Sequence, residues 1–154
     1  MQYRVTAATA LRAEPRRISP VVATLPAVDA SGLDVPANAR VLPFAPHGVL
    51  LEHASCAVTH GGMGATQKAL ARGIPVCVVP FGRDQLEVAA RTVHADAGTR
   101  VPAKRLTPER LRDAVREAAT KREGAARVAA GYAAAGGAPA GADAMEALLT
   151  PARR

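Results

Sequence analysis

The segment from residue 56 to residue 85 constrains the fold of this chain more than any other. It reads CAVTHGGMGATQKALARGIPVCVVPFGRDQ, in which two short apolar runs end at His60 and at Pro80. Continuous runs of this kind are typical of strands covered on both faces of a parallel sheet. Between them a helix is expected over 63–72, ended by Gly73 with Pro75 just beyond. The segment therefore predicts a β–α–β unit.

The rest of the chain repeats this alternation of strands and helices. Strands are expected at 21–25, 41–43, 56–59 and 76–79, with a strand or turn at 98–101. Helices are expected at 85–95, from Thr107-Pro108-Glu109 onward, at 124–135 and at 142–149, with a loop at 136–139. The alternation predicts an α/β fold, a Rossmann-like and mainly parallel sheet with flanking helices. We expect residues 1–20 to form a weakly patterned helical segment, and 21–150 to form one domain.

Composition narrows the class of protein. The chain has 154 residues, of which 49% are hydrophobic but only 3% aromatic, so one domain with a core of small side chains is expected. Its net charge of +7 is compatible with nucleic-acid binding. The basic residues are spread along the chain without interleaved aromatic residues, however, and we predict no nucleic-acid partner.

The cysteines and the hydropathy of the sequence indicate the cellular compartment of the protein. Cys56 and Cys77 both lie in apolar strand runs and are predicted to be free core thiols in a reducing cytosol. No apolar stretch approaches the ~20 residues that a membrane-spanning helix needs. The first 25 residues resemble no export signal. The sequence therefore predicts a cytoplasmic protein without stable membrane insertion.

The glycine-rich turn after the first strand of this unit is the leading candidate for a binding site. His60-Gly61-Gly62-Met63-Gly64 lies between a strand and the start of a helix, where backbone N–H groups and the helix dipole favour an anion. It is neither a P-loop nor the G-x-G-x-x-G of dinucleotide binders. Glycines also serve tight turns, but a histidine at the strand end favours a phosphate-binding loop that runs on to Ala65.

Other candidate residues lie near the ends of neighbouring strands. Asp84-Gln85 offers acceptor oxygens and an amide to two adjacent sugar hydroxyls, although Asp84 could instead cap the following helix. Phe44 could stack on a nucleobase or belong to the core, and His47 could be a solvated turn residue. Together with the phosphate loop, these residues predict binding of a nucleotide-sugar.

These motifs resemble the donor-binding half of the GT-B glycosyltransferases, the group that includes UDP-glycosyltransferases and bacterial antibiotic glycosyltransferases, over residues 40–120. The resemblance implies that Phe44, Ala45 and His47 contact the base and ribose, with Lys68 beside them where many members carry a glutamate. It implies that Asp84 and Gln85 hold the donor sugar. It also implies that the diphosphate is held by one loop, His60, Gly61, Gly62, Met63, Gly64, Ala65 and Thr66.

Three departures from the family pattern shape the expected function. Ala65 replaces a Ser/Thr of the phosphate loop, for which Thr66 could substitute, and Lys68 leaves a dTDP-sugar open beside a UDP-sugar. The resemblance further implies a second, N-terminal domain that binds the acceptor and carries the base, for which this chain has no room. No catalytic residue is therefore expected here, and the donor domain itself is expected to begin without its first strand.

The resemblance implies a donor-binding domain for transfer of a hexosyl group from a nucleotide diphosphate to an acceptor hydroxyl. No metal or other cofactor is expected, because His60 and the helix dipole can carry the diphosphate charge. Its expected partners are a nucleotide-sugar and an N-terminal acceptor domain or second chain. The alternatives are a non-catalytic nucleotide-sugar binding module, the remnant of a split enzyme, and, less favoured, an epimerase of the same architecture or a basic nucleic-acid-binding protein.

Overall fold

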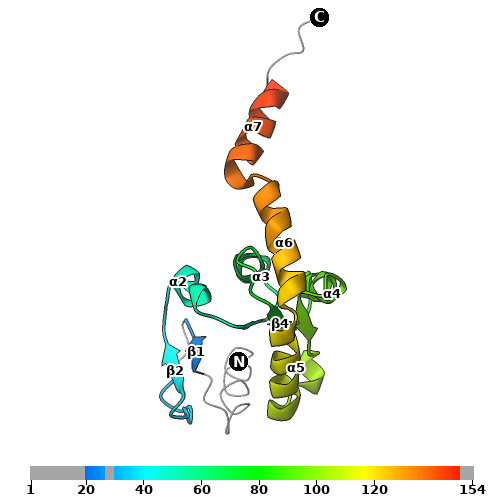
Figure 1. The fold of residues 1–154 in the computed structure, drawn as a ribbon. Helices are drawn as coiled ribbons and strands as arrows, with labels where there is room; N and C mark the ends of the chain where they lie inside the picture. Colours follow the sequence, from blue (N-terminus) through cyan, green and yellow to red (C-terminus); the bar gives the residue numbers. More distant parts are fainter. Residues whose placement is uncertain (1–19, 27–29, 150–154) are drawn as a thin grey trace, which may run out of the picture.

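The computed structural model describes residues 20–26 and 30–149 (Figure 1). The helix predicted within residues 1–20 lies outside the described residues, apart from residue 20. The described residues form five short strands: β1 Val21–Thr24, β2 Ala39–Leu42, β3 Ala57–Thr59, β4 Val76–Val78 and β5 Gly98–Arg100. Each pair among these strands is parallel, as predicted.

The strands do not form one continuous ladder. β1 pairs with β2, and β3, β4 and β5 make a second sheet in that order. The two sheets lie on opposite sides of the view in Figure 1, connected through α2. We predicted one mainly parallel sheet; the parallel direction is correct, whereas the division into two sheets depends on which strand edges meet and cannot be read from local pattern.

The helices follow the predicted order. They are α2 His47–Glu52, α3 Met63–Leu70, α4 Gln85–His94, α5 Pro108–Thr120, α6 Arg122–Ala134 and α7 Gly137–Leu149, with the 3₁₀ turn η1 Ala103–Arg105. The start of α5 is as predicted: Thr107 Oγ1 accepts a hydrogen bond from Arg110 N at 3.3 Å, Pro108 is the first helical residue and Glu109 lies in the first turn. This start is fixed by local chemistry alone.

Strand β4 divides the core into two layers. Val76 and Val78 pack with α3, α4 and α6 on one face, where Ala69, Ala89 and Ala125 are fully buried. Cys77 and Val79 pack against α5 on the other face, with Leu111 and Ala118. This alternation is the period of two that a covered strand imposes. The three-stranded sheet is thus the middle layer of an α/β/α arrangement.

Two glycines allow unusually close contacts, one between neighbouring strands and one between a helix and a turn. A Cβ at Gly98 would lie 1.9 Å from the carbonyl oxygen of Val76 on the neighbouring strand. A Cβ at Gly124 would lie equally close to the carbonyl oxygen of Asp96, so the start of α6 rests directly on the turn before β5. At both positions only glycine permits the observed contact.

Both cysteines are free thiols, as predicted. Burial, the largest cause, raises the pKa of Cys56 to about 12 and that of Cys77 to about 11. A thiol with such a pKa is almost entirely protonated near neutral pH, so neither cysteine is an effective nucleophile.

The C-terminal region differs most from prediction. Residues 136–139 were expected to form a loop, but α7 begins at Gly137 and includes Pro139 in its first turn. Pro139 is compatible with that position because the first N–H groups of a helix have no intrahelical partner. In Figure 1, α6 and α7 form a column that leads away from the sheets. No helix among the described residues is long and apolar enough to cross a bilayer.

Candidate functional site

The glycine-rich turn joins the end of β3 to the first residue of α3. Gly61 has a φ of 89°, and its N–H donates to Thr59 Oγ1 at 3.2 Å. The His60 ring folds back over the turn, since a Cβ at Gly62 would lie 2.5 Å from His60 Nε2. The imidazole and the bare backbone of the loop are therefore neighbours. An anion on this surface would meet N–H groups and a ring nitrogen together.

The turn also contacts the start of α4. A Cβ at Gly61 would lie 2.8 Å from Val78 Cγ1 and 3.1 Å from the carbonyl oxygen of Gln85. The two motifs that the sequence places after successive strands are thus in van der Waals contact through their backbones. Because β3 and β4 are parallel neighbours, their carboxyl ends meet at one edge of the sheet.

Helix α3 starts without a side-chain cap at Gly62. Its first intrahelical bond runs from Thr66 N to Gly62 O at 3.1 Å, so the earlier N–H groups, those of Met63, Gly64 and Ala65, have no acceptor within the helix. A Cβ at Gly64 would meet no atom within 4 Å, so the first turn borders open space. The Thr66 side chain is buried, and its Oγ1 has no hydrogen-bond partner among the described residues.

The loop between β4 and α4 has an unusual backbone. Arg83 adopts a φ of 57°, a left-handed conformation that non-glycine residues seldom adopt. Gln85 Oε1 accepts a hydrogen bond from Phe81 N at 2.9 Å and so closes the loop. Asp84 is exposed and its side chain makes no capping bond, so the helix-cap alternative is not supported. Its carboxylate is available to solvent beside the turn at Gly61.

Three of the base- and ribose-site candidates, Phe44, Ala45 and His47, lie beside the two-stranded sheet, whereas Lys68 lies on α3. Phe44 follows β2 and is 77% exposed, which rules out its alternative as a core residue, while Ala45 beside it is buried. His47 begins α2, and its Nε2 lies 3.0 Å from Thr24 Oγ1 at the end of β1. Sequence reasoning missed this tie between β1 and α2. Lys68 is exposed on α3.

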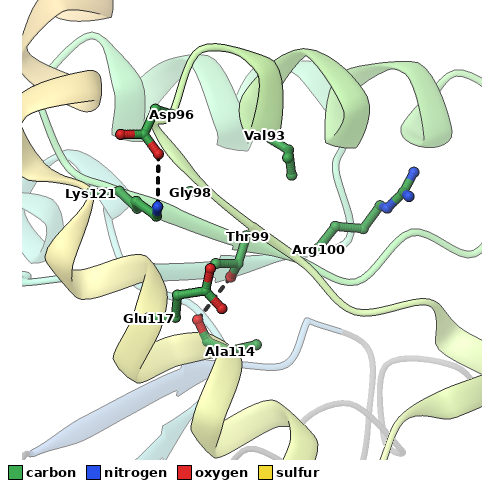
Figure 2. Close-up of a pocket in the computed structure, with 8 residues that line it drawn as sticks. All are labelled: Val93, Asp96, Gly98, Thr99, Arg100, Ala114, Glu117 and Lys121. Atoms are coloured by element: carbon green, nitrogen blue, oxygen red, sulfur yellow. Dashed lines mark hydrogen bonds and ion pairs between the residues drawn. The ribbon is translucent and has the colours of Figure 1, made fainter.

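A hollow that sequence reasoning did not anticipate lies away from the glycine turn. It measures about 300 Å³ and is bordered by β5, α4 and α5; Figure 2 shows Thr99, Arg100, Glu117 and Lys121 among its lining residues. A second hollow of about 330 Å³ adjoins it and shares Arg100, Ala114 and Glu117. Neither is lined by residues of the glycine turn. Only the folded chain reveals them, because their walls come from distant segments.

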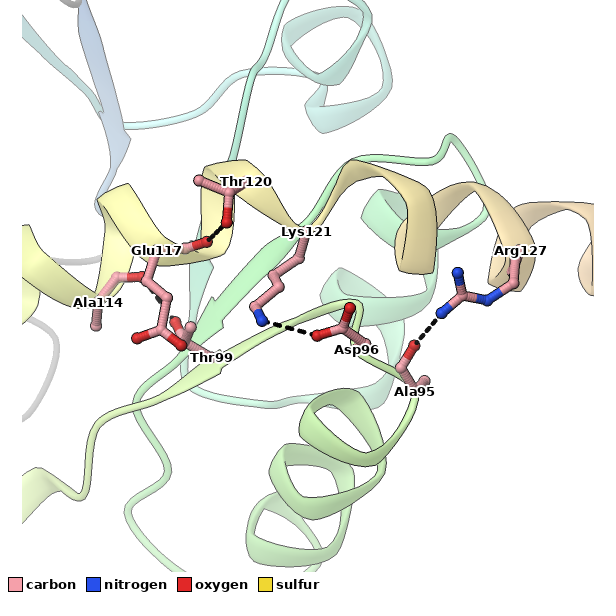
Figure 3. Close-up of polar contacts among 8 residues, drawn as sticks. All are labelled: Ala95, Asp96, Thr99, Ala114, Glu117, Thr120, Lys121 and Arg127. Carbon is pink, nitrogen blue, oxygen red and sulfur yellow. Dashed lines mark hydrogen bonds and ion pairs between the residues drawn. The ribbon is translucent and has the colours of Figure 1, made fainter.

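Polar contacts beside this hollow connect α4, β5, α5 and α6 (Figure 3). Lys121 Nζ lies 2.8 Å from Asp96 Oδ1, and Thr99 Oγ1 donates to the carbonyl oxygen of Ala114 at 2.8 Å. The hydrogen bond from Lys121 lowers the pKa of the Asp96 carboxyl, and the same bond raises the pKa of Lys121. Together with Gly124, these contacts anchor the start of α6 on the domain.

Comparison with known proteins identifies a family for most of the chain. Residues 12–148 match the family described as "Erythromycin biosynthesis protein CIII-like, C-terminal domain". A 4'-demethylrebeccamycin synthase of Lentzea aerocolonigenes is 43% identical over 82 residues, which are 53% of this chain and 20% of that protein. A 3-alpha-mycarosylerythronolide B desosaminyl transferase of Saccharopolyspora erythraea is 35% identical over 112 residues, 70% of this chain and 27% of that protein.

Solved structures agree with the sequence comparisons. The glycosyltransferase of kitacinnamycin superposes with a TM-score of 0.82 at 32% identity, over 95% of this chain and 39% of that one. The calicheamicin glycosyltransferase CalG4 gives 0.86 at 27% identity, over 96% and 39%. VinC, solved in complex with dTDP, gives 0.77 at 30% identity, over 86% and 35%. The chain spans about a fifth to a quarter of the curated relatives described above.

Proposed function

This chain belongs to the EryCIII-like C-terminal domain family of GT-B glycosyltransferases, and on that premise we propose that it binds a nucleoside diphosphate sugar as the donor half of a glycosyltransferase. The fold and family are those expected from the sequence motifs. The donor, its sugar and the activity of this chain are the proposal.

The contact between the glycine turn and the start of α4 carries this proposal. It brings the His60 ring, the first N–H groups of α3 and the Asp84-Gln85 pair to one edge of the sheet. A diphosphate on the helix N-terminus would be favoured by the dipole and by N–H donors. A sugar attached to it would then lie toward Asp84, whose exposed carboxylate can accept bonds from hydroxyl groups.

The buried Thr66 hydroxyl supports a phosphate in the same place. A buried hydroxyl without a partner costs free energy, and such exceptions in a native fold call for an explanation. Thr66 belongs to the first turns of α3, directly after Ala65, where the family pattern has a hydroxyl residue. We propose that Thr66 supplies the hydroxyl that Ala65 lacks.

The chemistry of such a site is stabilisation of a leaving group. In the transfer proposed, an acceptor oxygen bonds to the anomeric carbon while the bond from that carbon to the diphosphate oxygen breaks. Negative charge grows on the diphosphate, where the loop N–H groups and His60 would stabilise it. The base that takes the acceptor proton is expected on a part of the enzyme that this chain does not contain.

The residues near Phe44 bear on which nucleotide the donor carries. Phe44 is exposed enough to stack on a nucleobase, and His47 is already held by Thr24. Lys68 cannot accept a hydrogen bond from a ribose hydroxyl, because an ammonium group only donates. A deoxyribose lacks one of the hydroxyl groups that the glutamate of other family members would bind, so Lys68 in its place removes less binding for a deoxyribose nucleotide. VinC, a structural relative, was solved with dTDP. We therefore favour dTDP over UDP.

Titration calorimetry with dTDP, UDP and GDP tests the proposal. We expect binding in the micromolar range, tightest for dTDP, and its loss in His60→Ala. Asp84→Ala should weaken binding of a dTDP-sugar while leaving dTDP itself little changed. His94→Ala, at the far end of α4, is the matched control. Folded chain that binds none of the three nucleotides would overturn the proposal.

The second candidate function is nucleotide-sugar binding without catalysis. This chain spans about a fifth to a quarter of the curated relatives described above. An assay of sugar transfer to an added acceptor alcohol separates the two: we expect nucleotide binding without turnover by this chain alone. Robust turnover by the chain alone would show that no further part is required.

A further inference from the structure

Thr59 connects the glycine turn to the sheet through two hydrogen bonds. It is the last residue of β3, and its backbone carbonyl oxygen accepts from Val79 N at 2.8 Å. Its Oγ1 accepts from Gly61 N at 3.2 Å. The backbone of Thr59 is therefore tied to the end of β4, while its side chain holds the first glycine of the turn. The sequence motifs assign no role to this residue.

The bond from Gly61 matters because that residue is buried. Gly61 has a φ of 89°, a conformation that favours glycine, and a Cβ there would lie 2.8 Å from Val78 Cγ1. A buried backbone N–H without an acceptor costs free energy. Within the part of the chain that the structure describes, Thr59 Oγ1 is the acceptor of this N–H. The hydroxyl therefore helps to fix the shape of the turn.

The same bond separates Gly61 from the residues that follow it. An N–H that already donates to a hydroxyl inside the protein is not available to a phosphate. The N–H groups of Met63, Gly64 and Ala65, in contrast, precede the first intrahelical bond of α3. The first turn of α3 also borders open space at Gly64. The donors that can meet an anion therefore belong to the start of α3, whereas Gly61 belongs to the base of the turn.

Threonine is a suitable residue type for this position. Its β-branched side chain suits the end of a strand and has few χ1 rotamers, so little ordering is needed to place the hydroxyl. Serine offers the same acceptor with a less restricted side chain, and valine keeps the shape without any acceptor. Substitution of Thr59 by these two residue types therefore separates the effect of the hydroxyl from that of the shape.

A role in folding alone makes a different prediction from a role in the site. If the hydroxyl only stabilises the fold, its loss lowers the free energy of unfolding, but the folded chain binds ligand as before. If the hydroxyl positions the turn for phosphate, its loss also lowers the affinity of the folded chain for a diphosphate. The base candidates Phe44 and His47 lie beside the other sheet, so a diphosphate without a base isolates the effect at the turn.

We propose that Thr59 is a positioning residue for the donor diphosphate. Its hydroxyl engages the Gly61 N–H, holds the turn at its positive φ and so directs the first N–H groups of α3 toward the phosphates. The inference rests on the proposed function, because it concerns the same site. It gives Gly61 a task other than the one that the family resemblance implies: Gly61 shapes the loop and donates no hydrogen bond to the diphosphate.

The test compares three variants with the parent chain. Thr59→Val removes the acceptor, and Thr59→Ser keeps it. Thr120→Val is the matched control: it makes the same change at an exposed position of α5, where the hydroxyl donates to the carbonyl oxygen of Glu117. Helix α5 packs on the face of the sheet opposite to α3. The readouts are titration calorimetry with dTDP and with inorganic pyrophosphate, and amide hydrogen exchange of Gly61 and Gly64 by NMR.

We expect Thr59→Val to weaken binding of both ligands by roughly tenfold or more, because a buried N–H loses its acceptor. Thr59→Ser should bind within about threefold of the parent, and Thr120→Val should bind like the parent. In the parent chain, the Gly61 amide should exchange slowly with or without dTDP, whereas the Gly64 amide should become protected only when dTDP binds.

Equal dTDP affinity of the parent and of folded Thr59→Val would overturn the proposal, even if the variant were less stable. Protection of the Gly61 amide that appears only with dTDP would also overturn it, and that measurement needs no variant to fold. If the parent bound neither dTDP nor pyrophosphate, the proposed function and the role of Thr59 would both be overturned. Either of the first two outcomes, in a parent chain that binds dTDP, would overturn the role of Thr59 alone.

Discussion

The glycine turn and helix α7 are both exposed, but for opposite physical reasons. The turn is exposed on one side only; beneath it Val78 and the backbone of Gln85 hold Gly61 at contact distance. Helix α7 has no buried residue at all. The first is a surface that two segments of the chain shape together, whereas no described residue packs over the second. Exposure alone therefore does not distinguish these two kinds of surface, but the contacts behind them do.

The largest expected difference in unfolding free energy is between the same substitution, leucine to alanine, in the core and in α7. Leu111→Ala removes a side chain that is fully buried against Cys77 and Val79 and should cost about 2–5 kcal/mol of unfolding free energy. Leu148→Ala removes the same atoms from α7 and should change it by less than about 0.5 kcal/mol. Urea unfolding of both variants measures the difference. A cost above about 1 kcal/mol for Leu148→Ala would mean that α7 is packed within this chain.

The glycine turn offers the next contrast. Gly61→Ala would force a Cβ against Val78 Cγ1 in a backbone conformation with positive φ, and we expect a loss of about 1–3 kcal/mol. Gly64→Ala meets no atom within 4 Å and lies in α3, where alanine should stabilise the helix by about 0.5–1 kcal/mol. Opposite signs in denaturant unfolding are expected. Equal effects would show that the turn is not held by the contacts described.

A smaller effect concerns the helix that closes the second core layer. Thr107→Ala removes the acceptor of Arg110 N at the start of α5 and should cost about 1 kcal/mol. Thr120→Ala, near the other end of the same helix, is the control and should stay within about 0.5 kcal/mol of the parent. Thermal unfolding resolves the two. A neutral Thr107→Ala would indicate that packing of Leu111 alone fixes the start of α5.

The smallest effect depends on pH. The bond from Lys121 lowers the pKa of Asp96, so the folded state is favoured by the ionised carboxylate. That contribution is complete above the usual aspartate pKa of about 3.9 and is lost as the pH falls through the lower folded value. Asp96→Asn should therefore lower the urea midpoint slightly at pH 7 but hardly at pH 2. Asp143→Asn on α7 is the control at both pH values. A larger deficit at pH 2 would contradict this sign.

Much of the fold could be predicted because its signals are local. Thr107-Pro108-Glu109 starts α5, Gly73 and Pro75 end the region of α3, and the apolar runs around Val58 and Val78 become parallel strands. Residue 136 lies in a turn, as predicted, but the loop prediction is wrong for 137–139, because a proline and two glycines indicate a loop unless the proline falls in the first turn of a helix. The candidate phosphate loop was found for the same local reason, a glycine cluster at a strand-to-helix junction.

The order of strands and helices, the family and the residue types at the strand ends follow from the sequence alone, since they depend on periodicity, capping and motif chemistry. The folded chain was needed to show that Gly61 contacts Gln85 and that His47 lies against Thr24. It was also needed to show that the strands form two sheets and that no described residue covers α7. Such facts join residues far apart in the chain. They depend on how faces pack in space, and no local pattern records that.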